Sequence, residues 1–536
     1  MADLKKEDGT TTTNDQEKAE VLNDFFISVF TKENLSHIPD FTPANVNNTL
    51  NDIDIDSTMV HKKLISINPS KAMGPDGLHP RLLKEASKEL SEPLAIIFNR
   101  TLKEGVIPHE WKCGQVTPIF KKGSKSTPSN YRPVSLTSVV CKIMESIVRE
   151  KLLDHMSPHL SKYQHGFMNG RSCVTQLLDC IGEWTKQLDE GNSLDVIYLD
   201  YAKAFDSVPH IRLLKKLEGY GIKDNVLLWI KNFLLDRKQR VVISGEASTW
   251  RDVLSGIPQG SVLGPVLFIC YVNDMPETVQ SMIRMFADDT KVFAQSNTQE
   301  QCHNLQSDLN ILQNWADDWQ LRFNATKCKT LYLGRNNTKF TYQMRNDQTQ
   351  VDLEETDCEK DLGVHVDPTL KFSKHCEKIV NKANQILGLI RRSFDYIDSE
   401  SLTYLFKGLV RPHLEYANSV WSPLNKTDAT LIENVQRRAA KLVPDLKELD
   451  YEDRLKKLKL PSLSYRRLRG GLIETYKKTY GLYNIDPESF FEFNCDTRTR
   501  GHKYKIKKET ARLEIRKHVY GMRVVNLWNN LPSTVV

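Results

Sequence analysis

The chain has 536 residues, of which 40% are hydrophobic, 26% charged and 9% aromatic. This length and composition exclude a peptide hormone, a small secreted scaffold and a disordered chain, and are typical of a globular protein with several domains. The formal net charge of +6 is too small for this length to indicate a class of partner, so its distribution matters more.

The charge is uneven along the chain. Residues 1–60 have a net charge of −8, whereas residues 441–536 have a net charge of +9. The acidic end is typical of a solvated leader. The basic end is either a phosphate-binding surface or a solvated helical face, and charge alone leaves both interpretations open.

The first 60 residues predict one helix and a linker. Apolar residues recur at helical spacing over residues 16–30, which indicates a docking helix, and the threonine-rich start before it is expected to pack against nothing. Residues 34–56 have the Pro, Asn and Asp content of a linker. A first domain boundary is therefore expected near residue 60.

The cysteines and the N-terminus indicate an intracellular protein. Ten cysteines occur without a CxxC pair, which argues against a zinc site and, together with the absence of a signal peptide after Met1, favours reduced thiols. The longest apolar stretch, 262–272, is far shorter than the roughly 20 residues of a membrane-spanning helix. No membrane association is expected.

Residues 61–300 mix helical and strand patterns. Residues 194–200 form a short apolar run that is β-branched and aromatic, which predicts a buried strand. Two further short strands bracket Asp288 and Asp289 and predict a hairpin. The other predicted elements are helices at 79–104, 140–157, 172–189 and 210–235, strands at 240–244 and 250–254, and a helix from Ser261.

The remaining chain changes from mixed structure to helices near residue 370. An amphipathic helix carries one apolar stripe that ends in Trp315 and Trp319, which predicts core packing rather than a base-stacking platform. Strands are predicted at 329–334 and 361–366, and helices at 376–394, 400–413 and 427–442. A second domain boundary is therefore expected near residue 370.

Three carboxylates are the candidate catalytic groups. Asp288 and Asp289 lie at the predicted hairpin turn, where aspartate is also common for purely structural reasons. Asp200 ends the buried strand, where an unpaired charge would be costly. Oxygen ligands converging in this way suit two divalent ions roughly 3.5–4 Å apart, the arrangement used for phosphoryl transfer. The pattern therefore indicates nucleotidyl transfer.

Several motifs, in order, resemble the reverse transcriptases of non-LTR (LINE) retrotransposons of the jockey and chicken-repeat type. The resemblance extends from about residue 16 to the end of the chain. Any one motif is weak, but several in the right order are specific. The motifs are Ser70-Lys-Ala-Met-Gly-Pro-Asp-Gly77, Asn130-Tyr-Arg-Pro-Val-Ser-Leu136, Gln164-His-Gly-Phe167, Tyr198-Leu-Asp-Tyr-Ala-Lys-Ala-Phe-Asp206, Gly256-Ile-Pro-Gln-Gly-Ser261 and Phe286-Ala-Asp-Asp289.

The resemblance implies a metal site and a catalytic acid. Asp200, Asp288 and the backbone carbonyl of Tyr201 would hold two Mg²⁺ ions, with Mn²⁺ as a substitute, and Asp289 would be the third acid of the motif. Lys327 would act as a general acid for the departing pyrophosphate, although a lysine in a lysine-rich loop is more often simply solvated.

The resemblance also implies nucleotide and template contacts. Lys121 and Arg132 would grip the incoming triphosphate, Gln259 and Gly260 would touch the nucleotide, and Phe205 would be the steric gate that selects deoxynucleotides. The alternatives are a surface charge at Lys121, a structural turn at Gln259 and core packing at Phe205. The residues expected to contact the template are Gly166, Phe167 and Arg171.

The implied fold is an α+β right-hand polymerase. Its expected parts are an acidic leader and linker (1–60), fingers and a palm with an antiparallel sheet (61–370), a helical thumb (371–442) and a basic C-terminal segment (443–536). Thumb residues expected to meet backbone phosphates are Arg391, Arg392, Arg437, Arg438 and Lys441.

The resemblance implies an RNA-directed DNA polymerase with an RNA template, a DNA primer or target, and dNTPs as partners, working as a ribonucleoprotein in the nucleus, the cytoplasm or both. The leader is too short for the endonuclease domain that the family's complete proteins carry, so a truncated element copy is expected. Two alternatives remain: a catalytically silent, domesticated nucleic-acid-binding remnant, and a group II intron-type maturase.

Overall fold

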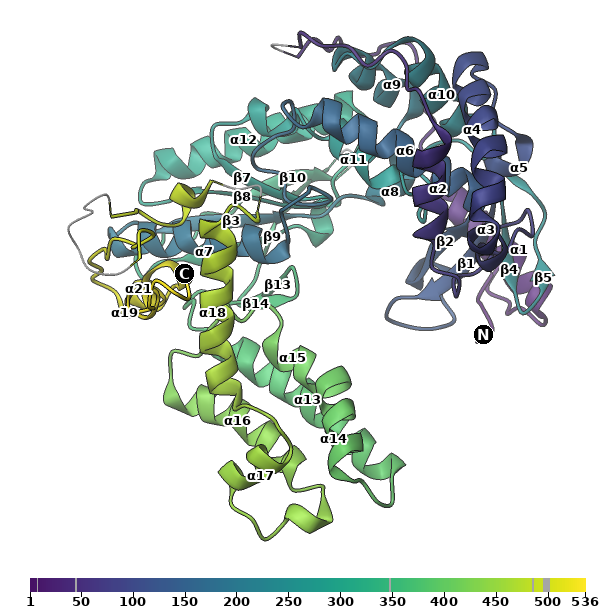
Figure 1. The fold of residues 1–536 in the computed structure, drawn as a ribbon. Helices are drawn as coiled ribbons and strands as arrows, with labels where there is room; N and C mark the ends of the chain where they lie inside the picture. The colour runs from purple at the N-terminus through teal and green to yellow at the C-terminus, as the bar shows by residue number, and fades with distance from the viewer. Residues whose placement is uncertain (7, 44–45, 347–348, 484–485, 495–501) are drawn as a thin grey trace. The chain divides into compact units, whose positions relative to one another are not determined.

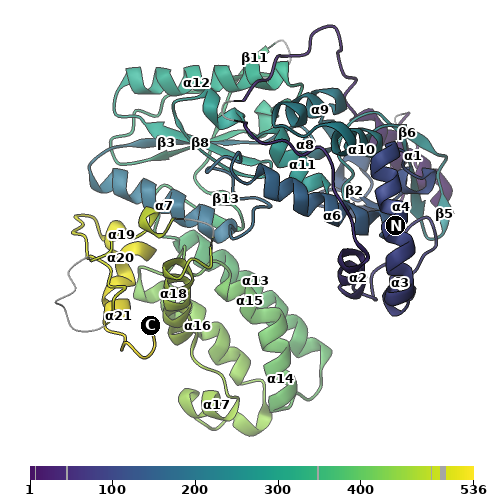
Figure 2. The same cartoon turned by 45° about the horizontal axis from the view of Figure 1, so that its top comes forward.

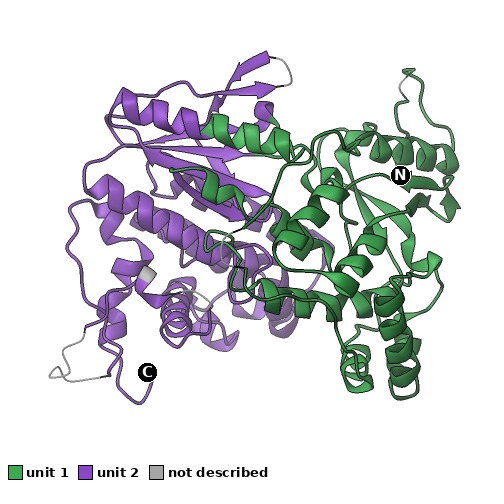
Figure 3. Cartoon of the chain, turned by 90° about the horizontal axis from the view of Figure 1, so that it is seen from above, with its two compact units in different colours: residues 1–164, 200–280, 309–324 green, residues 165–199, 281–308, 325–536 purple. Residues whose placement is uncertain are grey.

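The structure, a computed structural model, describes all residues except 7, 44–45, 347–348, 484–485 and 495–501. The chain divides into two compact units, each assembled from three separate segments (Figure 3). Unit 1 holds residues 1–164, 200–280 and 309–324, and unit 2 holds residues 165–199, 281–308 and 325–536. Both units combine helices with β-strands, so the predicted combination of helices and sheets is confirmed.

Unit 1 is built on a five-stranded sheet. The strand order is β2-β1-β4-β5, and β6 pairs with β4. Its strands are β1 (Cys113–Phe120), β2 (Tyr131–Leu136), β4 (Arg237–Ile243), β5 (Glu246–Ala247) and β6 (Arg251–Val253). Its helices are α1 (Asp15–Ser28), α2 (Ser57–Ile65), α3 (Pro80–Glu85), α4 (Ser87–Glu104), α5 (His109–Lys112), α6 (Val139–Met156), α8 (Ala204–Ser207), α9 (His210–Gly219), α10 (Asp224–Leu234) and α11 (Gly264–Tyr271).

The sequence did not predict β1 and β2, and proline explains why. Pro118 of β1 lies directly opposite Pro133 of β2 in the antiparallel register. Proline has no N–H to donate, so a proline within an apolar run argues against a strand. Here β1 pairs with its other neighbour, β4, only over Cys113–Val116, so Pro118 lies beyond that ladder and leaves it intact.

The expectation that the N-terminal stretch packs against nothing is wrong. Leu4 is completely buried and joins Ala19, Leu22 and Phe26 of α1 in a small apolar cluster with strand residues of unit 1. The backbone N–H of Leu4 donates to Thr12 Oγ1 at 2.9 Å, and Lys5 bridges Thr11. The threonines that suggested a solvated start therefore fold the stretch back on itself.

The segment with a linker composition is also attached to unit 1. The backbone N–H of Leu50 donates to the carbonyl of Gly221 at 2.9 Å, and Ile53 and Ile55 are buried. The ring of Phe41 makes an edge contact with Trp319, with ring centroids 5.8 Å apart. A few apolar anchors are therefore enough to attach this polar stretch to unit 1.

Unit 2 contains a second five-stranded sheet, in the order β12-β9-β3-β8-β7. Helix α7 (Cys173–Asp189) lies along one face of this sheet (Figure 1). The strands are β3 (Leu194–Leu199), β7 (Met282–Phe286), β8 (Asp289–Gln295), β9 (Lys329–Leu333) and β12 (Glu354–Glu355). Two hairpins accompany the sheet, formed by β10 (Gln343–Asn346) with β11 (Thr349–Asp352) and by β13 (Glu359–Asp361) with β14 (Val364–Val366).

Two strand predictions in this unit have different outcomes. The buried strand at 194–200 is confirmed as β3, and the hairpin around Asp288 as β7 and β8. The single strand expected at 361–366 is wrong, because the chain reverses between β13 and β14 at Leu362 and Gly363. Both residues have positive φ, 44° and 91°, as a two-residue hairpin turn requires.

The C-terminal part of unit 2 is helical. Helices α13, α15 and α16 lie side by side (Figure 2). The helices are α13 (Ser373–Ser393), α14 (Ser399–Leu405), α15 (Arg411–Glu415), α16 (Lys426–Ala440), α17 (Tyr451–Lys457), α18 (Leu463–Thr479), α19 (Glu514–Lys517), α20 (Tyr520–Arg523) and α21 (Val525–Asn529). The Trp-striped helix predicted before β9 is α12 (Gln299–Asp318), whose residues are divided between the two units.

Among the described residues, no helix combines the length and the apolarity that crossing a membrane requires. The nine described cysteines are free thiols, and Cys495 lies outside the described residues.

Candidate active site

The β7–β8 hairpin presents the adjacent carboxylates of unit 2. Phe286 pairs with Asp289, so Ala287 and Asp288 alone form the connection. Asp288 is half-buried and Asp289 is exposed. Ala287 has φ 56°, a conformation that glycine adopts freely and that costs a residue with a Cβ on the order of 1–2 kcal/mol. The turn therefore holds Asp288 in a strained, tightly defined loop.

Asp200 follows strand β3 directly in the chain. The register pairs Leu199, the last residue of β3, with Thr290 of β8, and Val196 and Ile197 of β3 are completely buried. Asp200 begins a segment of unit 1, where its carbonyl accepts from the backbone N–H of Asn324 at 2.7 Å. The Asp200 side chain is half-buried.

Tyr201 is fixed in the core of unit 1. Its ring stacks on Phe323 with ring centroids 4.6 Å apart, and its hydroxyl donates to Met275 Sδ at 3.1 Å. The backbones of Tyr201 and Phe323 also form an isolated antiparallel bridge. The ring of Tyr201 is therefore a packing group, which leaves the backbone as the part of this residue that could serve a metal.

The β1–β2 hairpin carries the two candidate triphosphate ligands, Lys121 directly after β1 and Arg132 in β2. The backbone N–H of Lys121 donates to the carbonyl of Asn130 at 2.8 Å, and Arg132 lies opposite Ile119 in the β1–β2 register. Both basic side chains are exposed. A hairpin with two solvent-facing cations suits a polyanion.

The glycine-flanked turn packs closely against β2 and α8. The Gln259 carbonyl accepts from Ser135 N–H at 2.7 Å, and a Cβ on Gly260, at φ 117°, would lie 2.5 Å from the Ser135 carbonyl oxygen. On the other side, a Cβ on Gly256 would lie 2.5 Å from the Asp206 carbonyl oxygen. Glycine is therefore required at both positions because backbone approaches backbone.

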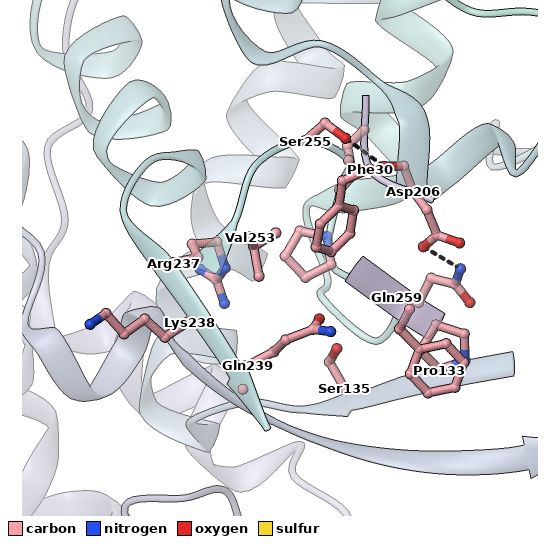
Figure 4. A pocket seen from close by; sticks show the side chains of 15 residues that line it. Phe30, Pro133, Ser135, Asp206, Arg237, Lys238, Gln239, Val253, Ser255 and Gln259 are labelled. Carbon is pink, nitrogen blue, oxygen red and sulfur yellow. Dashed lines mark hydrogen bonds between the residues drawn. The ribbon is translucent and has the colours of Figure 1, made fainter. Parts of the chain in front are cut away.

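A small pocket of about 40 Å³ opens beside this turn (Figure 4). Phe30, Pro133, Ser135, Asp206 and Gln259 are among the residues that line it. The Gln259 and Asp206 side chains point toward each other, and Gln259 Nε2 donates to Asp206 Oδ1 at 2.8 Å.

Phe205 lies next to this turn and is half-buried. Its ring stacks on Phe268 of α11 with centroids 4.6 Å apart, and its carbonyl accepts from the backbone N–H of Ile257 at 2.7 Å. The ring thus packs against the core on one side and lies beside the candidate nucleotide residues.

The candidate template residues lie before α7 in unit 2. The backbone N–H of His165 donates to the carbonyl of Met285 at 2.8 Å, which joins this segment to β7. Gly166 is buried, Phe167 has φ 57° and is 42% exposed, and Arg171 is half-buried. Burial lowers the pKa of Arg171. An exposed aromatic ring suits stacking on a base, and an arginine suits a phosphate.

The remaining basic candidates face solvent. Lys327 is exposed in a short 3₁₀ turn before β9. The five basic residues predicted to meet phosphates are all exposed, namely Arg391, Arg392, Arg437, Arg438 and Lys441.

The structure therefore gathers the site residues into two sets. In unit 1, backbone and side-chain contacts bring Phe205, Gln259 and Gly260 together with β2, the strand that carries Arg132. In unit 2 the His165 contact joins the Gly166–Phe167 segment to the strand before Asp288. Asp200, Tyr201 and Lys121 belong to unit 1, whereas Arg171, Asp289 and Lys327 belong to unit 2.

The donor chemistry fits a hard divalent cation. Asp200 and Asp288 supply carboxylate oxygens, the ligands that Mg²⁺ prefers, and both are half-buried, which strengthens charge interactions. Within the described residues, no group of three or more His, Cys, Asp or Glu side chains gathers as metal ligands do. The metal assignment therefore depends on the donor set and the motifs.

Two acids near the turn, the buried Glu145 and the half-buried Asp206, received no role from the sequence. Glu145 of α6 accepts from the backbone N–H groups of Val262 and Leu263 at 2.7 and 3.0 Å, and burial raises its pKa. Asp206 accepts from Gln259, and burial raises its pKa as well. A charged residue within the apolar run of α6 is a signal that could have identified Glu145.

Comparison with known proteins gives one family and several relatives. The reverse transcriptase (RNA-dependent DNA polymerase) family matches residues 119–372. The RNA-directed DNA polymerases from the mobile element jockey of Drosophila melanogaster and Drosophila funebris are 27% and 28% identical over 82% and 70% of this chain. The retrovirus-related Pol polyprotein from type-1 retrotransposable element R1 of Bradysia coprophila is 24% identical over 66% of it. The chain spans 50%, 42% and 35% of these three relatives.

Proposed function

Because the chain carries a reverse transcriptase domain of the non-LTR retrotransposon kind, we propose that it is an RNA-directed DNA polymerase that extends a primer 3′-OH with dNTPs on an RNA template. The family match carries this proposal, because the reverse transcriptase family aligns with residues 119–372, a range that contains Asp200, Asp288 and Asp289.

Asp200 and Asp288, with the Tyr201 carbonyl, would hold two Mg²⁺ ions, and Mn²⁺ would substitute for them. Bound there, the ions would bring the primer 3′-OH and the α-phosphate together and neutralise the charge that develops during transfer. Asp289 is the third acid, and its exposure leaves it accessible to primer or nucleotide. Lys327 would donate a proton to the leaving pyrophosphate.

The nucleotide subsite lies in unit 1. Lys121 and Arg132 would bind the triphosphate, and Gln259 with Gly260 would contact the sugar or base. The Phe205 ring is fixed from behind by Phe268, so it cannot retreat without disturbing the core. A fixed ring of this kind suits a steric gate, which must exclude a 2′-hydroxyl rather than yield to it.

The nucleic-acid partners would meet unit 2. Gly166, Phe167 and Arg171 would contact the template, and the exposed arginines of α13 and α16 would grip the duplex backbone. The fold would then be a right hand, with fingers and palm over residues 61–370, a thumb over 371–442 and a basic segment over 443–536. The protein would act as a ribonucleoprotein in the nucleus or the cytoplasm.

The decisive test is primer extension on an annealed RNA template with dNTPs and Mg²⁺. Wild-type protein should extend the primer, and Asp288→Ala should lose extension at least 10³-fold, since a metal ligand is removed. Asp395→Ala, which changes an exposed aspartate of the same unit, is the matched control and should be unaffected. Duplex binding without extension by the wild type would contradict the polymerase and support a binding protein instead.

A second assay tests the proposed gate. Phe205→Ala should raise the use of ribonucleotides relative to deoxynucleotides by about tenfold or more, because about 1.4 kcal/mol of steric exclusion corresponds to a factor of ten. The comparison is the ratio of kcat/KM values for rGTP and dGTP on the same template. An unchanged ratio in an active variant would assign Phe205 to core packing alone.

A further inference from the structure

We propose that Asp206 is a positioning residue that fixes the side-chain amide of Gln259 in the nucleotide subsite, so that Gln259 presents its Oε1 as a hydrogen-bond acceptor to the incoming nucleotide. This inference rests on the proposed polymerase function and goes beyond it, because neither the motifs nor the relatives assign a task to Asp206.

The contact itself is specific. Gln259 Nε2 donates to Asp206 Oδ1 at 2.8 Å, and the two side chains point toward each other beside the pocket (Figure 4). An ionised carboxylate only accepts hydrogen bonds, so it selects the amide rotamer with nitrogen inward and oxygen outward. Without that partner the amide could turn over and present a donor instead.

The backbone around Asp206 is held independently of its carboxylate. Ser255 Oγ donates to the Asp206 carbonyl at 2.8 Å, and the backbone N–H of Gly256 donates to the Val208 carbonyl at 2.8 Å. Removing the Asp206 side chain therefore leaves the turn docked. The loss of the Asp206 carboxylate should therefore change the orientation of the Gln259 side chain rather than the fold.

The link extends from Gln259 to the candidate triphosphate ligand. The carbonyl of Gln259 accepts from Ser135 N–H at 2.7 Å, and Ser135 lies on the strand that carries Arg132. Burial raises the pKa of Asp206, whereas the hydrogen bond from Gln259 and the positive charges of Lys203 and Arg132 act against this rise by favouring the ionised form. Asp206 thus connects, through one glutamine, the turn that faces the nucleotide with the strand that would bind its phosphates.

The expected consequence is a defect in nucleotide use rather than in chemistry. Asp206→Ala should raise the KM for dNTP about tenfold while kcat changes less than threefold, since one oriented hydrogen bond is lost in binding and metal ligands are intact. Asp206→Asn can still accept from Gln259 Nε2 through Oδ1 and should recover most of the affinity. Asp40→Ala, at an exposed aspartate in the same unit, is the control.

A double-mutant cycle tests whether Asp206 acts through Gln259. Gln259→Ala should reproduce the Asp206→Ala defect, and the double variant should be no worse than either single one. Effects that multiply, or an Asp206→Ala variant with wild-type KM, would overturn the inference. The thermal midpoint of each variant should stay within about 4 °C of wild type, which separates a positioning defect from misfolding.

The cycle is repeated by calorimetric titration of dNTP with Mg²⁺ into the protein, a measurement that needs no turnover. If the wild type extends no primer, the proposed function fails. In that case non-additive weakening of dNTP binding by Asp206→Ala and Gln259→Ala would still support the inference, and additive weakening or none would contradict it. A wild type that neither extends primers nor binds dNTP would overturn both.

Discussion

The Lys291–Asp361 ion pair joins β8 to β13 in the interior of unit 2. The side chains are 2% and 3% exposed, so the loss of one partner leaves the other charge buried. Asp361→Asn should therefore lower the free energy of unfolding by about 3–5 kcal/mol, measured by urea titration. The double variant Lys291→Met with Asp361→Leu should recover most of that loss, because two apolar groups need no compensation. A double variant as unstable as the single one would contradict this account.

Two buried histidines of unit 2 make it sensitive to acid. Burial, together with nearby positive charge, lowers the pKa of His165 and of His375 from 6.5 to about 3. Between those values the unfolded chain binds a proton that the folded chain does not, so the free energy of unfolding falls as the pH falls below 6.5. From pH 7 to pH 5 each histidine should cost about 2 kcal/mol.

Urea unfolding at the two pH values measures this cost. His165→Gln and His375→Gln should each reduce the pH dependence by about 2 kcal/mol, whereas His37→Gln, at an exposed histidine, should leave it unchanged. Equal acid dependence in all four proteins would show that these imidazoles do not control it.

Single residues also show what the sequence could not predict. Asp200, Asp288 and Asp289 were found because motifs place them, and Glu145 and Asp206 were not given roles because their partners lie 117 and 53 positions away along the chain. A hydrogen bond between residues so far apart leaves no periodic signal. The roles of the motif residues stay predictions until activity is measured.

The β7–β8 connection is an element whose backbone geometry invites a test. Ala287→Gly should raise the free energy of unfolding by up to about 1 kcal/mol, since glycine accepts a φ of 56° without strain. Ala287→Val should lower it by more than 1 kcal/mol and reduce primer extension, because a β-branched residue at positive φ displaces Asp288. A fully active and stable valine variant would mean that the turn tolerates rearrangement.

Helix α1 carries one buried amide that bonds to the unit 1 sheet and the segment that follows it. Asn23 Nδ2 donates to Ser248 Oγ at 3.0 Å and to the Thr249 carbonyl at 2.9 Å, and its Oδ1 accepts from Gln239 Nε2 at 3.1 Å. Asn23→Leu should cost about 1–3 kcal/mol and speed hydrogen exchange over α1. Gln16→Ala, at an exposed position of the same helix, is the control and should change stability by less than about 0.5 kcal/mol.

Elements differed in how well the sequence predicted them, for physical reasons. Amphipathic helices such as α7 and α13 carry a periodic signal, and so does the buried strand β3. Strands β1 and β2 carry prolines that contradict a strand, and the β13–β14 reversal depends on Leu362 taking a positive φ. Tertiary contacts compensate for these local preferences, and a single sequence does not reveal such contacts.

At the scale of the whole molecule, neither unit is a continuous piece of chain. The large core of unit 2 combines Trp184, Leu194 and Phe293 with residues beyond 325. A fragment of residues 325–536 should therefore lack cooperative unfolding and bind a hydrophobic dye, because β9 loses its partner β3 and Asp361 loses Lys291. A sharp urea transition in that fragment would show that the helical part folds alone.

The attachment of the N-terminus also constrains the order of events during synthesis. Asn23 bonds to a residue 225 positions later, and at about 5–20 residues per second the ribosome takes roughly 11–45 s to make that stretch. The first helix to emerge must therefore wait for its partner until almost half of the chain has been made. During that interval its apolar face must be protected by chaperones or remain open to aggregation, so faster initiation on the same messenger would be expected to lower the yield of folded protein.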